Sequence, residues 1–202
     1  MTYSKLYKIF ANIPKLKTQR LVLRKVSERD AEDVFEYSRE PAVSQYLLWS
    51  PHKNIEYTKD HLYRIKNDYR IGKYYDWAIE LNAGENKGKM IGTCGFTSFD
   101  LSNNSAEIGY VINLKYWGQG IAAEALSAVI SFGFDKLLLH RIEGRYLINN
   151  INSRKVMEKC NMSYEGVLRS SMVVKGNYED VGICSIISDE YIKHKAQEEL
   201  SI

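Results

Sequence analysis

Apolar and polar residues recur along the chain in two periods, one typical of strands and one typical of helices. Arg20–Arg24 alternates between polar and apolar side chains, which favours a strand. Residues 121–138 instead place apolar side chains three and one positions apart, as on one face of a helix: Leu126, Val129, Ile130, Gly133, Phe134 and Leu137.

The same patterns predict the other elements. Strands are expected near residues 20–24, 76–81, 90–99, 106–112 and 141–148, and two or three more before residue 187. Helices are expected at 27–37, with Ser27 as a cap and Asp30 three residues on, and at 57–69, 121–138 and 153–159. Strands and helices mixed in this order predict an α/β fold.

Composition adds that this fold is an ordinary globular one. The chain has 202 residues, of which 45% are hydrophobic and 26% charged, so one domain is expected and a disordered chain is excluded. Lys and Arg number 28 against 25 Asp and Glu, a net charge of +3. Because this excess is small and spread along the chain, we expect no nucleic-acid partner.

The sequence also lacks the marks of export, membrane insertion and metal binding. Lys5 and Lys8 interrupt the N-terminal apolar stretch, unlike the core of a secretion signal. Charged residues interrupt the longest apolar region, Ile121–Leu139, so no membrane span is expected. The three cysteines are widely spaced and form no metal-ligand pattern, which predicts no metal site and suits the reducing cytoplasm.

A glycine-containing turn, Tyr116-Trp-Gly-Gln-Gly-Ile-Ala-Ala123, precedes the longest predicted helix. Without Cβ atoms, Gly118 and Gly120 let the backbone approach a ligand closely and adopt positive φ. The helix that follows begins with N–H groups that have no partner within the helix, so the segment is a candidate phosphate site. A turn that uses glycine only for tightness would have the same sequence.

Two other classes of phosphate site fit this turn less well. No Lys-Ser/Thr pair follows the second glycine, which excludes a nucleoside-triphosphate loop. Gly118-x-Gly120-x-x-Ala123 does spell a dinucleotide motif, but it does not follow the first strand. The next strand ends in Asn149-Asn150 rather than in an acid, which argues against a dinucleotide site.

Five segments resemble one enzyme superfamily when they are taken in order: Thr18-x-Arg20-Leu-x-Leu-Arg24, Ala106-Glu-Ile-Gly-Tyr-Val-Ile112, Trp117-Gly-Gln-Gly-Ile-Ala-Ala-Glu-Ala-Leu126, Asn150-Ile-Asn-Ser-Arg-Lys-Val-Met-Glu-Lys159 and Glu165-Gly-x-Leu-Arg169. They resemble the GNAT superfamily of acetyl-CoA-dependent N-acetyltransferases, and in particular its ribosomal-protein N-terminal acetyltransferase (RimJ/RimL-like) branch. The resemblance covers about residues 16–190 and implies a single acetyltransferase domain over 1–202. It also implies a mostly antiparallel sheet of about seven strands, splayed at the cofactor site, with about four helices.

Acetyl-CoA is the cosubstrate that the resemblance implies, with no metal. The resemblance places the pyrophosphate on the turn and helix start, at Gly118, Gln119, Gly120, Ile121, Ala122 and Ala123. The pantetheine arm would add, like a strand, to the strand edge at Val111, Ile112 and Asn113. Asn150 and Ser153 complete the predicted cofactor-binding set.

Direct acetyl transfer requires a neutral amine, a donor to the carbonyl oxygen and stabilisation of the leaving thiolate. Glu107 is the predicted base, because related enzymes use a carboxylate on this strand and alternation places it on the face of Gly109 and Val111. A structural carboxylate is the alternative.

Ser153 is the predicted donor to the thiolate, because the branch carries a serine at this position. Capping of the helix, shared with Asn150 and Asn152, is the alternative. Met157 stands where many relatives have a tyrosine acid, which shifts weight to Ser153. The family's glycine after this helix is replaced by asparagine, a residue that also tolerates the left-handed conformation. We expect the three cysteines to be small buried residues: Cys94, Cys160 and Cys184.

The acceptor is expected to be a primary amine, with a protein or peptide N-terminus first. A polyamine or aminoglycoside acceptor and a non-catalytic acyl-CoA-binding module are the alternatives. Four residues fall where the resemblance places the amine pocket: Trp49, Tyr57, Tyr178 and Asp180. Packing or surface roles would explain the same residues. A monomer or a homodimer is expected.

Overall fold

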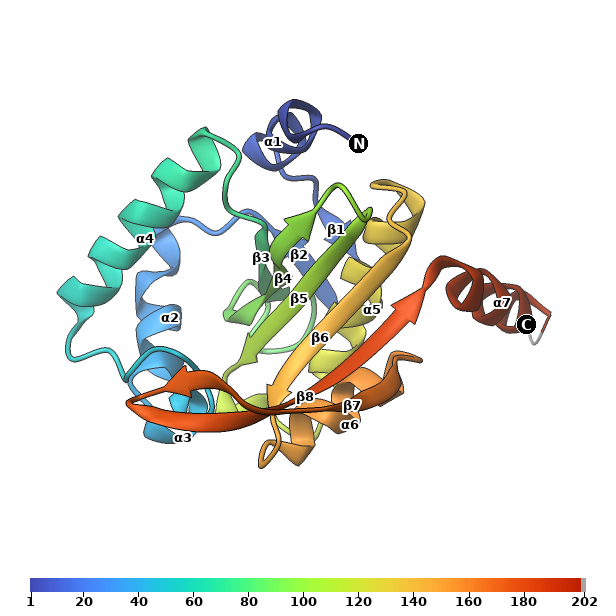
Figure 1. Ribbon diagram of the computed structural model, residues 1–202. Helices are drawn as coiled ribbons and strands as arrows, with labels where there is room; N and C mark the ends of the chain where they lie inside the picture. The colour runs from blue at the N-terminus through green and yellow to red at the C-terminus, as the bar shows by residue number, and fades with distance from the viewer. Residues whose placement is uncertain (201–202) are drawn as a thin grey trace.

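The computed structural model describes residues 1–200. In this part of the chain eight strands form one sheet, in the order β1-β2-β3-β4-β5-β6-β8-β7 (Figure 1). The strands are β1 (Leu16–Lys17), β2 (Leu21–Arg24), β3 (Asp76–Leu81), β4 (Met90–Asp100), β5 (Ser105–Ile112), β6 (Arg141–Leu147), β7 (Ser163–Val174) and β8 (Asn177–Ile187). Every neighbouring pair is antiparallel except β5 and β6. The predicted class and the mostly antiparallel sheet are confirmed, with one strand more than expected.

Seven α-helices lie in the same described residues, three more than expected. They are α1 (Tyr3–Ala11), α2 (Ala31–Ser38), α3 (Pro41–Ser44), α4 (Ile55–Arg70), α5 (Ile121–Asp135), α6 (Ile151–Lys159) and α7 (Ser188–Glu199). In Figure 1, α5 lies behind the sheet, α2 and α4 pack on each other at its left, and α6 lies beneath the lower end of β6 and β8.

The core fills the space between the sheet and α5 and extends to the buried faces of α2 and α4. Trp77 of β3 makes edge contacts with Phe96 of β4 and with Phe132 of α5. Phe10 of α1 enters the same cluster. With Leu6 one turn earlier, Phe10 gives α1 a two-residue buried face, which is too short for the apolar pattern alone to predict a helix.

The sheet opens between β5 and β6, as the resemblance implied. Their parallel pairing joins Ser105–Ile108 to Arg141–Gly144 and no further. Both strands continue, β5 to Ile112 on its pairing with β4 and β6 to Leu147 on its pairing with β8. Because the neighbours on either side hold the two strands in place, the gap between them is a fixed part of the fold.

Several local predictions are confirmed by backbone geometry. Ser27 and Asp30 form a reciprocal capping box before α2. Asn161, which follows α6, takes a left-handed φ of 61°. The long helix begins at Ile121 as expected but ends at Asp135 rather than at residue 138. The chain turns there, because Leu138 also has positive φ (57°), and Leu137 reaches the core from outside the helix.

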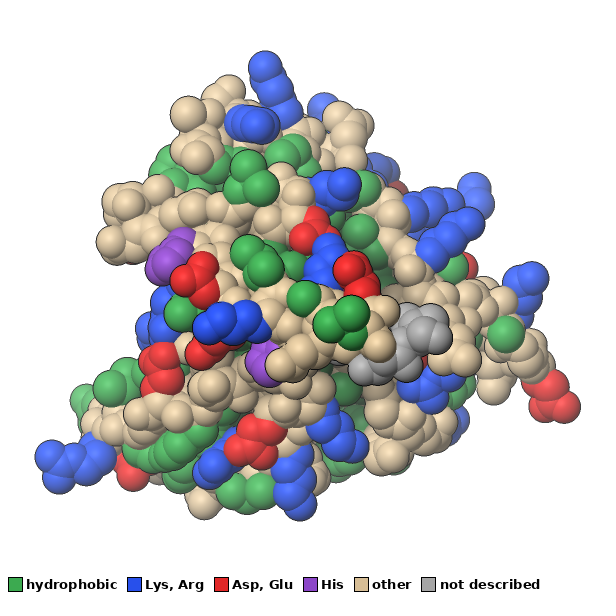
Figure 2. All heavy atoms as spheres, turned by 90° about the vertical axis from the view of Figure 1, so that its right-hand side faces the viewer, with side chains coloured by type: hydrophobic (Ala, Val, Ile, Leu, Met, Phe, Trp, Pro, Cys, Tyr) green, Lys and Arg blue, Asp and Glu red, His purple; other side chains and the backbone are tan. Residues whose placement is uncertain are grey.

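The surface carries mixed charge on the side that displays α7. Figure 2 shows Lys and Arg side chains on this face interspersed with Asp and Glu, without a continuous basic stripe outside the grey atoms. Among residues 1–200, no helix is both long enough and apolar enough to cross a membrane.

Candidate active site

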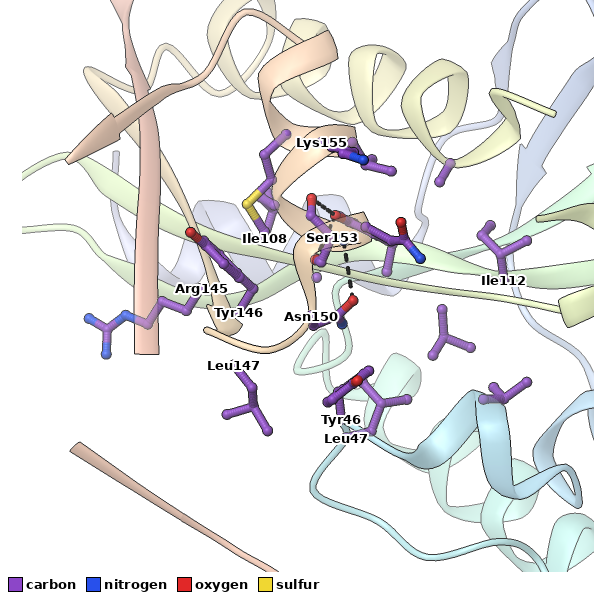
Figure 3. A pocket seen from close by; sticks show the side chains of 18 of the residues that line it. Tyr46, Leu47, Ile108, Ile112, Arg145, Tyr146, Leu147, Asn150, Ser153 and Lys155 are labelled. Carbon is purple, nitrogen blue, oxygen red and sulfur yellow. Dashed lines mark hydrogen bonds between the residues drawn. The ribbon is translucent and has the colours of Figure 1, made fainter. Parts of the chain in front are cut away.

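A cavity of about 730 Å³ occupies the gap between β5 and β6. That volume is typical of small-molecule sites. Its walls come from the chain around α3, the outer halves of β5 and β6, the turn before α5, and α6, with Met172 and Val181 added from the β7–β8 hairpin. Figure 3 shows Asn150 and Ser153 on one side of the cavity and Tyr46 and Leu47 across from them.

The turn before α5 has the shape of an anion site. Gly118 and Gly120 both adopt a left-handed φ of 75°. The space beside each Cα is not crowded by neighbouring atoms, so a ligand can approach the backbone closely. In α5 the N–H of Glu124 is the first that is bonded, to the carbonyl of Gly120 (3.1 Å). Within residues 1–200 the N–H groups of 118–123 have no acceptor, so they are available to a diphosphate.

Trp117, at the start of the turn, fixes the turn to the sheet. Its indole N–H donates to the carbonyl of Ile112 at the end of β5 (2.8 Å). The aromatic side chain therefore ties the anion-binding turn to the strand edge that the pantetheine arm is predicted to use.

A second attachment holds the first turn of α5. The carboxylate of Glu124 accepts hydrogen bonds from the Thr18 hydroxyl (2.6 Å), the Arg20 backbone N–H (2.8 Å) and the Arg20 Nε (2.6 Å). Arg20 also donates from Nη1 to the carbonyl of Gln119 (3.0 Å). Burial alone would raise the pKa of Glu124, but these donors outweigh burial and lower it. The negative charge beside the anion site is thereby neutralised.

The strand edge is less uniform than predicted. Val111 and Ile112 line the cavity, whereas Asn113 is buried away from it. The backbone N–H of Asn113 donates to Ile91 (2.7 Å), and its side-chain amide donates to Glu36 (3.0 Å). Gln119 does not line the cavity either, and its side chain folds back to the carbonyl of Lys115 (3.1 Å).

Ser153 lies on the first turn of α6, inside the cavity. The helix is capped by Asn150, whose side-chain oxygen accepts from the Ser153 N–H (3.2 Å). The Ser153 hydroxyl is directed instead to the hydroxyl of Tyr110 on β5 (2.8 Å). Asn150 therefore makes the cap, and a catalytic role for the Ser153 hydroxyl stays a prediction.

Glu107 lines the cavity on the face of β5 that it shares with Gly109 and Val111, as alternation predicted. Arg145 of β6 lies across the gap, with its Nε 3.4 Å from the Glu107 carboxylate, and also pairs with Glu143 (3.0 Å). Burial raises the pKa of Glu107, and the neighbouring Arg145 only partly reverses that shift. A carboxylate with raised pKa is a more effective proton acceptor than a free one.

The four residues expected around the acceptor do not line this cavity: Trp49, Tyr57, Tyr178 and Asp180. Trp49 and Tyr57 pack around His52. Tyr178 is 76% exposed on the hairpin, and Asp180 accepts the backbone N–H of Ser170 (2.7 Å). A part for any of them in acceptor binding stays a prediction.

Sequence analysis missed Tyr110, Arg145 and the pairing of Arg20 with Glu124. Tyr110 and Arg145 lie on strands that were predicted, but their roles depend on which strands are neighbours. Arg20 and Glu124 belong to the motifs that carry the family resemblance, and this was the feature of the sequence that could have pointed to their pairing. Lys155 and Lys159, one turn apart on α6, add positive charge to the cavity wall.

Gly120→Glu is expected to abolish coenzyme A binding, because a carboxylate would occupy the place where the free amides face the diphosphate. Titration calorimetry with coenzyme A measures this loss. Gly120→Asn is the control, since asparagine tolerates positive φ and adds no charge, so this variant is expected to retain measurable binding. Equal affinity of the Glu variant and the wild type would exclude the turn as the diphosphate site.

Arg20→Gln is expected to weaken coenzyme A binding about tenfold at low salt, because it leaves the Glu124 carboxylate unneutralised beside the anion site. The double variant Arg20→Gln/Glu124→Gln removes the repulsive charge and is expected to recover most of the affinity in the same calorimetric titration. If the double variant bound as weakly as the single one, charge neutralisation would not be the function of this pair.

Comparison with known proteins agrees with this geometry. The acetyltransferase (GNAT) domain family matches residues 20–163. An uncharacterized N-acetyltransferase, p20, from Bacillus licheniformis is 34% identical over 176 residues, covering 87% of this chain and 97% of the relative. The [ribosomal protein uS5]-alanine N-acetyltransferase of Escherichia coli K12 is 24% identical over 192 residues, covering 90% and 95%.

A solved structure of RimL, a ribosomal L7/L12 alpha-N-protein acetyltransferase, in complex with coenzyme A has the same fold. It superposes with a TM-score of 0.73 at 22% identity, over 88% of this chain and 99% of that one. Together with the match over residues 20–163, these similarities identify the family. The chain belongs to the GNAT acetyltransferases and is an acetyl-CoA-dependent N-acetyltransferase.

Proposed function

We propose that this enzyme transfers the acetyl group of acetyl-CoA directly to the free α-amine at the N-terminus of a protein or peptide. The observation that carries the proposal is the charge of the cavity. Among its described lining residues Glu107 is the one carboxylate, and it stands beside Arg145. One partly neutralised acid suits a single amine and disfavours a polycation, which requires several carboxylates.

The chemistry of an α-amine matches a base of this kind. The reference pKa of an α-amine is about 7.7–8.0, against about 10.4 for lysine, so a substantial fraction is already neutral near neutral pH. Glu107 then has to accept a proton only as the C–N bond forms. It lines the same cavity as Ala42 and Val43 of α3, so an amine that enters this cavity can reach it.

Two relatives support the choice of acceptor. One is named as an alanine N-acetyltransferase of ribosomal protein uS5, and the RimL structure is named as an alpha-N-protein acetyltransferase of ribosomal L7/L12. At 24% and 22% identity they favour an N-terminal amine as the acceptor class rather than one particular protein. A reducing compartment suits three buried free thiols, and we propose the cytoplasm.

In this proposal the diphosphate of acetyl-CoA is bound by the backbone of Gly118, Gln119 and Gly120 and by the start of α5, at Ile121, Ala122 and Ala123. Val111 and Ile112 contact the pantetheine arm, and Asn150 holds the α6 end. The sulfur lies beside Ser153, whose hydroxyl donates to it as the C–S bond breaks. No acyl-enzyme forms, because every cysteine is buried and burial raises the pKa of each thiol: Cys94, Cys160 and Cys184.

The acceptor class can be tested by offering the enzyme acetyl-CoA with equal concentrations of N-terminal peptides, polyamines and aminoglycosides. Mass spectrometry of the products is expected to show acetyl groups on peptide α-amines and not on lysine side chains. An N-terminally blocked copy of each peptide is the control and is expected to remain unmodified. Acetylated polyamine with unmodified peptides would overturn the proposal, as would coenzyme binding without turnover of any amine.

Glu107→Gln is expected to lower kcat about 10²-fold, the size of a general-base contribution. In the wild type, kcat/KM should fall on the acidic side as Glu107 takes up a proton. Arg145→Gln removes the charge that lowers the pKa of Glu107, so the acidic limb is expected to move to higher pH.

Arg154→Gln is the matched control for this pH profile. Arg154 pairs with Glu158 outside the cavity, so loss of the same charge there should leave the acidic limb in place. Every variant is measured with the same acceptor amine. The titration of that amine therefore affects all the pH profiles equally and does not contribute to the differences between them. An acidic limb that stayed in place in Arg145→Gln would exclude Glu107 as the titrating base.

A further inference from the structure

Tyr110 is a polar group in the cavity to which neither the sequence motifs nor the proposed function gives a role. It lies on β5, two residues beyond the last one paired with β6, and its side chain reaches α6. Its hydroxyl lies 2.8 Å from the carbonyl oxygen of Ser153 and 2.8 Å from the Ser153 Oγ. Both residues line the cavity.

The number of hydrogens on these two hydroxyls limits how they are arranged. The phenol has one hydrogen and faces two acceptors on the same serine. If the phenol donates to the carbonyl, the serine hydrogen is bonded back to the phenol oxygen and points away from the cavity. If the phenol donates to Oγ, the serine hydrogen is released and can turn into the cavity.

Tyr110 keeps its hydrogen in either arrangement. Burial raises its pKa well above the ordinary value of a phenol, although the hydrogen bond with Ser153 acts in the opposite direction. The phenol is therefore a donor throughout the neutral range and does not act as a base toward Ser153. In the arrangement in which the phenol donates to Oγ, that hydrogen bond also makes the serine hydroxyl a stronger donor, because chains of hydrogen bonds polarise one another.

We propose that Tyr110 is a positioning residue that directs the hydroxyl hydrogen of Ser153 onto the sulfur of the coenzyme. The proposal rests on the role given to Ser153 in the proposed function. During transfer the C–N bond forms, the C–S bond breaks and its electron pair stays on sulfur. The amine proton passes to Glu107 and then to water. Tyr110 donates to the Ser153 Oγ and Ser153 donates a hydrogen bond to the thiolate, neither losing its proton, and water protonates the released thiolate.

The position of Tyr110 explains how the site functions with Met157 on α6. Met157 is buried, 1% exposed, where its Sδ and Cε would contact a Cβ added at Gly144. It therefore fills the space between α6 and β6 and supplies no proton donor. The phenol reaches the first turn of the same helix from β5 instead, and acts through the serine.

The test measures the thiol pKa of bound coenzyme A and needs no acceptor amine. The ultraviolet absorbance of the thiolate is followed against pH at saturating enzyme, for the wild type, Tyr110→Phe and Ser153→Ala. Donation to sulfur lowers the thiol pKa, so both variants are expected to raise it by roughly one pKa unit, about tenfold in thiolate population. Tyr164→Phe is the control, because its ring packs under Arg154 outside the cavity and should leave the value unchanged.

Turnover gives the second measurement. Ser153→Ala is expected to lower kcat about 10²-fold and Tyr110→Phe about tenfold, with little change in coenzyme affinity. The double variant should match Ser153→Ala alone, because Tyr110 acts only through that serine. Thermal unfolding of each variant shows whether the fold is intact.

Three results would overturn the proposal. They are a thiol pKa in Tyr110→Phe equal to that of the wild type, independent losses that multiply in the double variant, and a loss in Tyr110→Phe that tracks reduced thermal stability alone. Failure of the N-terminal peptides as acceptors would leave the thiol titration intact, so the two proposals fail separately.

Discussion

The early end of the pairing between β5 and β6 is the constraint on which the site depends. Beyond Ile108 and Gly144, β5 and β6 make no backbone hydrogen bonds to each other. Each strand is still held by its other neighbour, β5 by β4 and β6 by β8. The opening is therefore built into the strand pairing, and it exposes a strand edge deep within the molecule. Such edges invite pairing by any extended amide-bearing chain, and here the turn before α5 and the first turn of α6 close the two sides.

Charge is divided between the two ends of this opening. The end next to α5 offers backbone amides, and its acidic residue Glu124 accepts a hydrogen bond from Thr18 and is neutralised by Arg20. The other end holds Glu107 with Arg145. Backbone amides suit an anion and a carboxylate suits an amine, so the proposed coenzyme and acceptor would meet different charges at the two ends. The residues at positions 18, 20 and 124, far apart in the chain, are joined by hydrogen bonds at the first of these ends.

Local signals in the sequence predicted what local geometry controls. The glycine turn, the helix after it, the capping box at Ser27 and the left-handed Asn161 each depend on a few consecutive residues, and all are confirmed. The contact of Tyr110 with Ser153 spans 43 residues and depends on β5 lying against α6. The periodic pattern of apolar residues does not show which residues so far apart in the chain come into contact. The short helix α1 was not predicted for another reason. Its buried face has only two residues, so its apolar pattern cannot be told from that of a loop in contact with the core.

The burial of all three thiols has a consequence for the product of the reaction. In the proposed reaction each turnover would release a free thiol inside the cavity, where a reactive cysteine would form a mixed disulfide with it under oxidising stress and block the site. Here Cys94, Cys160 and Cys184 are enclosed, and burial raises the pKa of each. Thiolate is the attacking species in such exchange, so burial disfavours a mixed disulfide between these cysteines and the coenzyme.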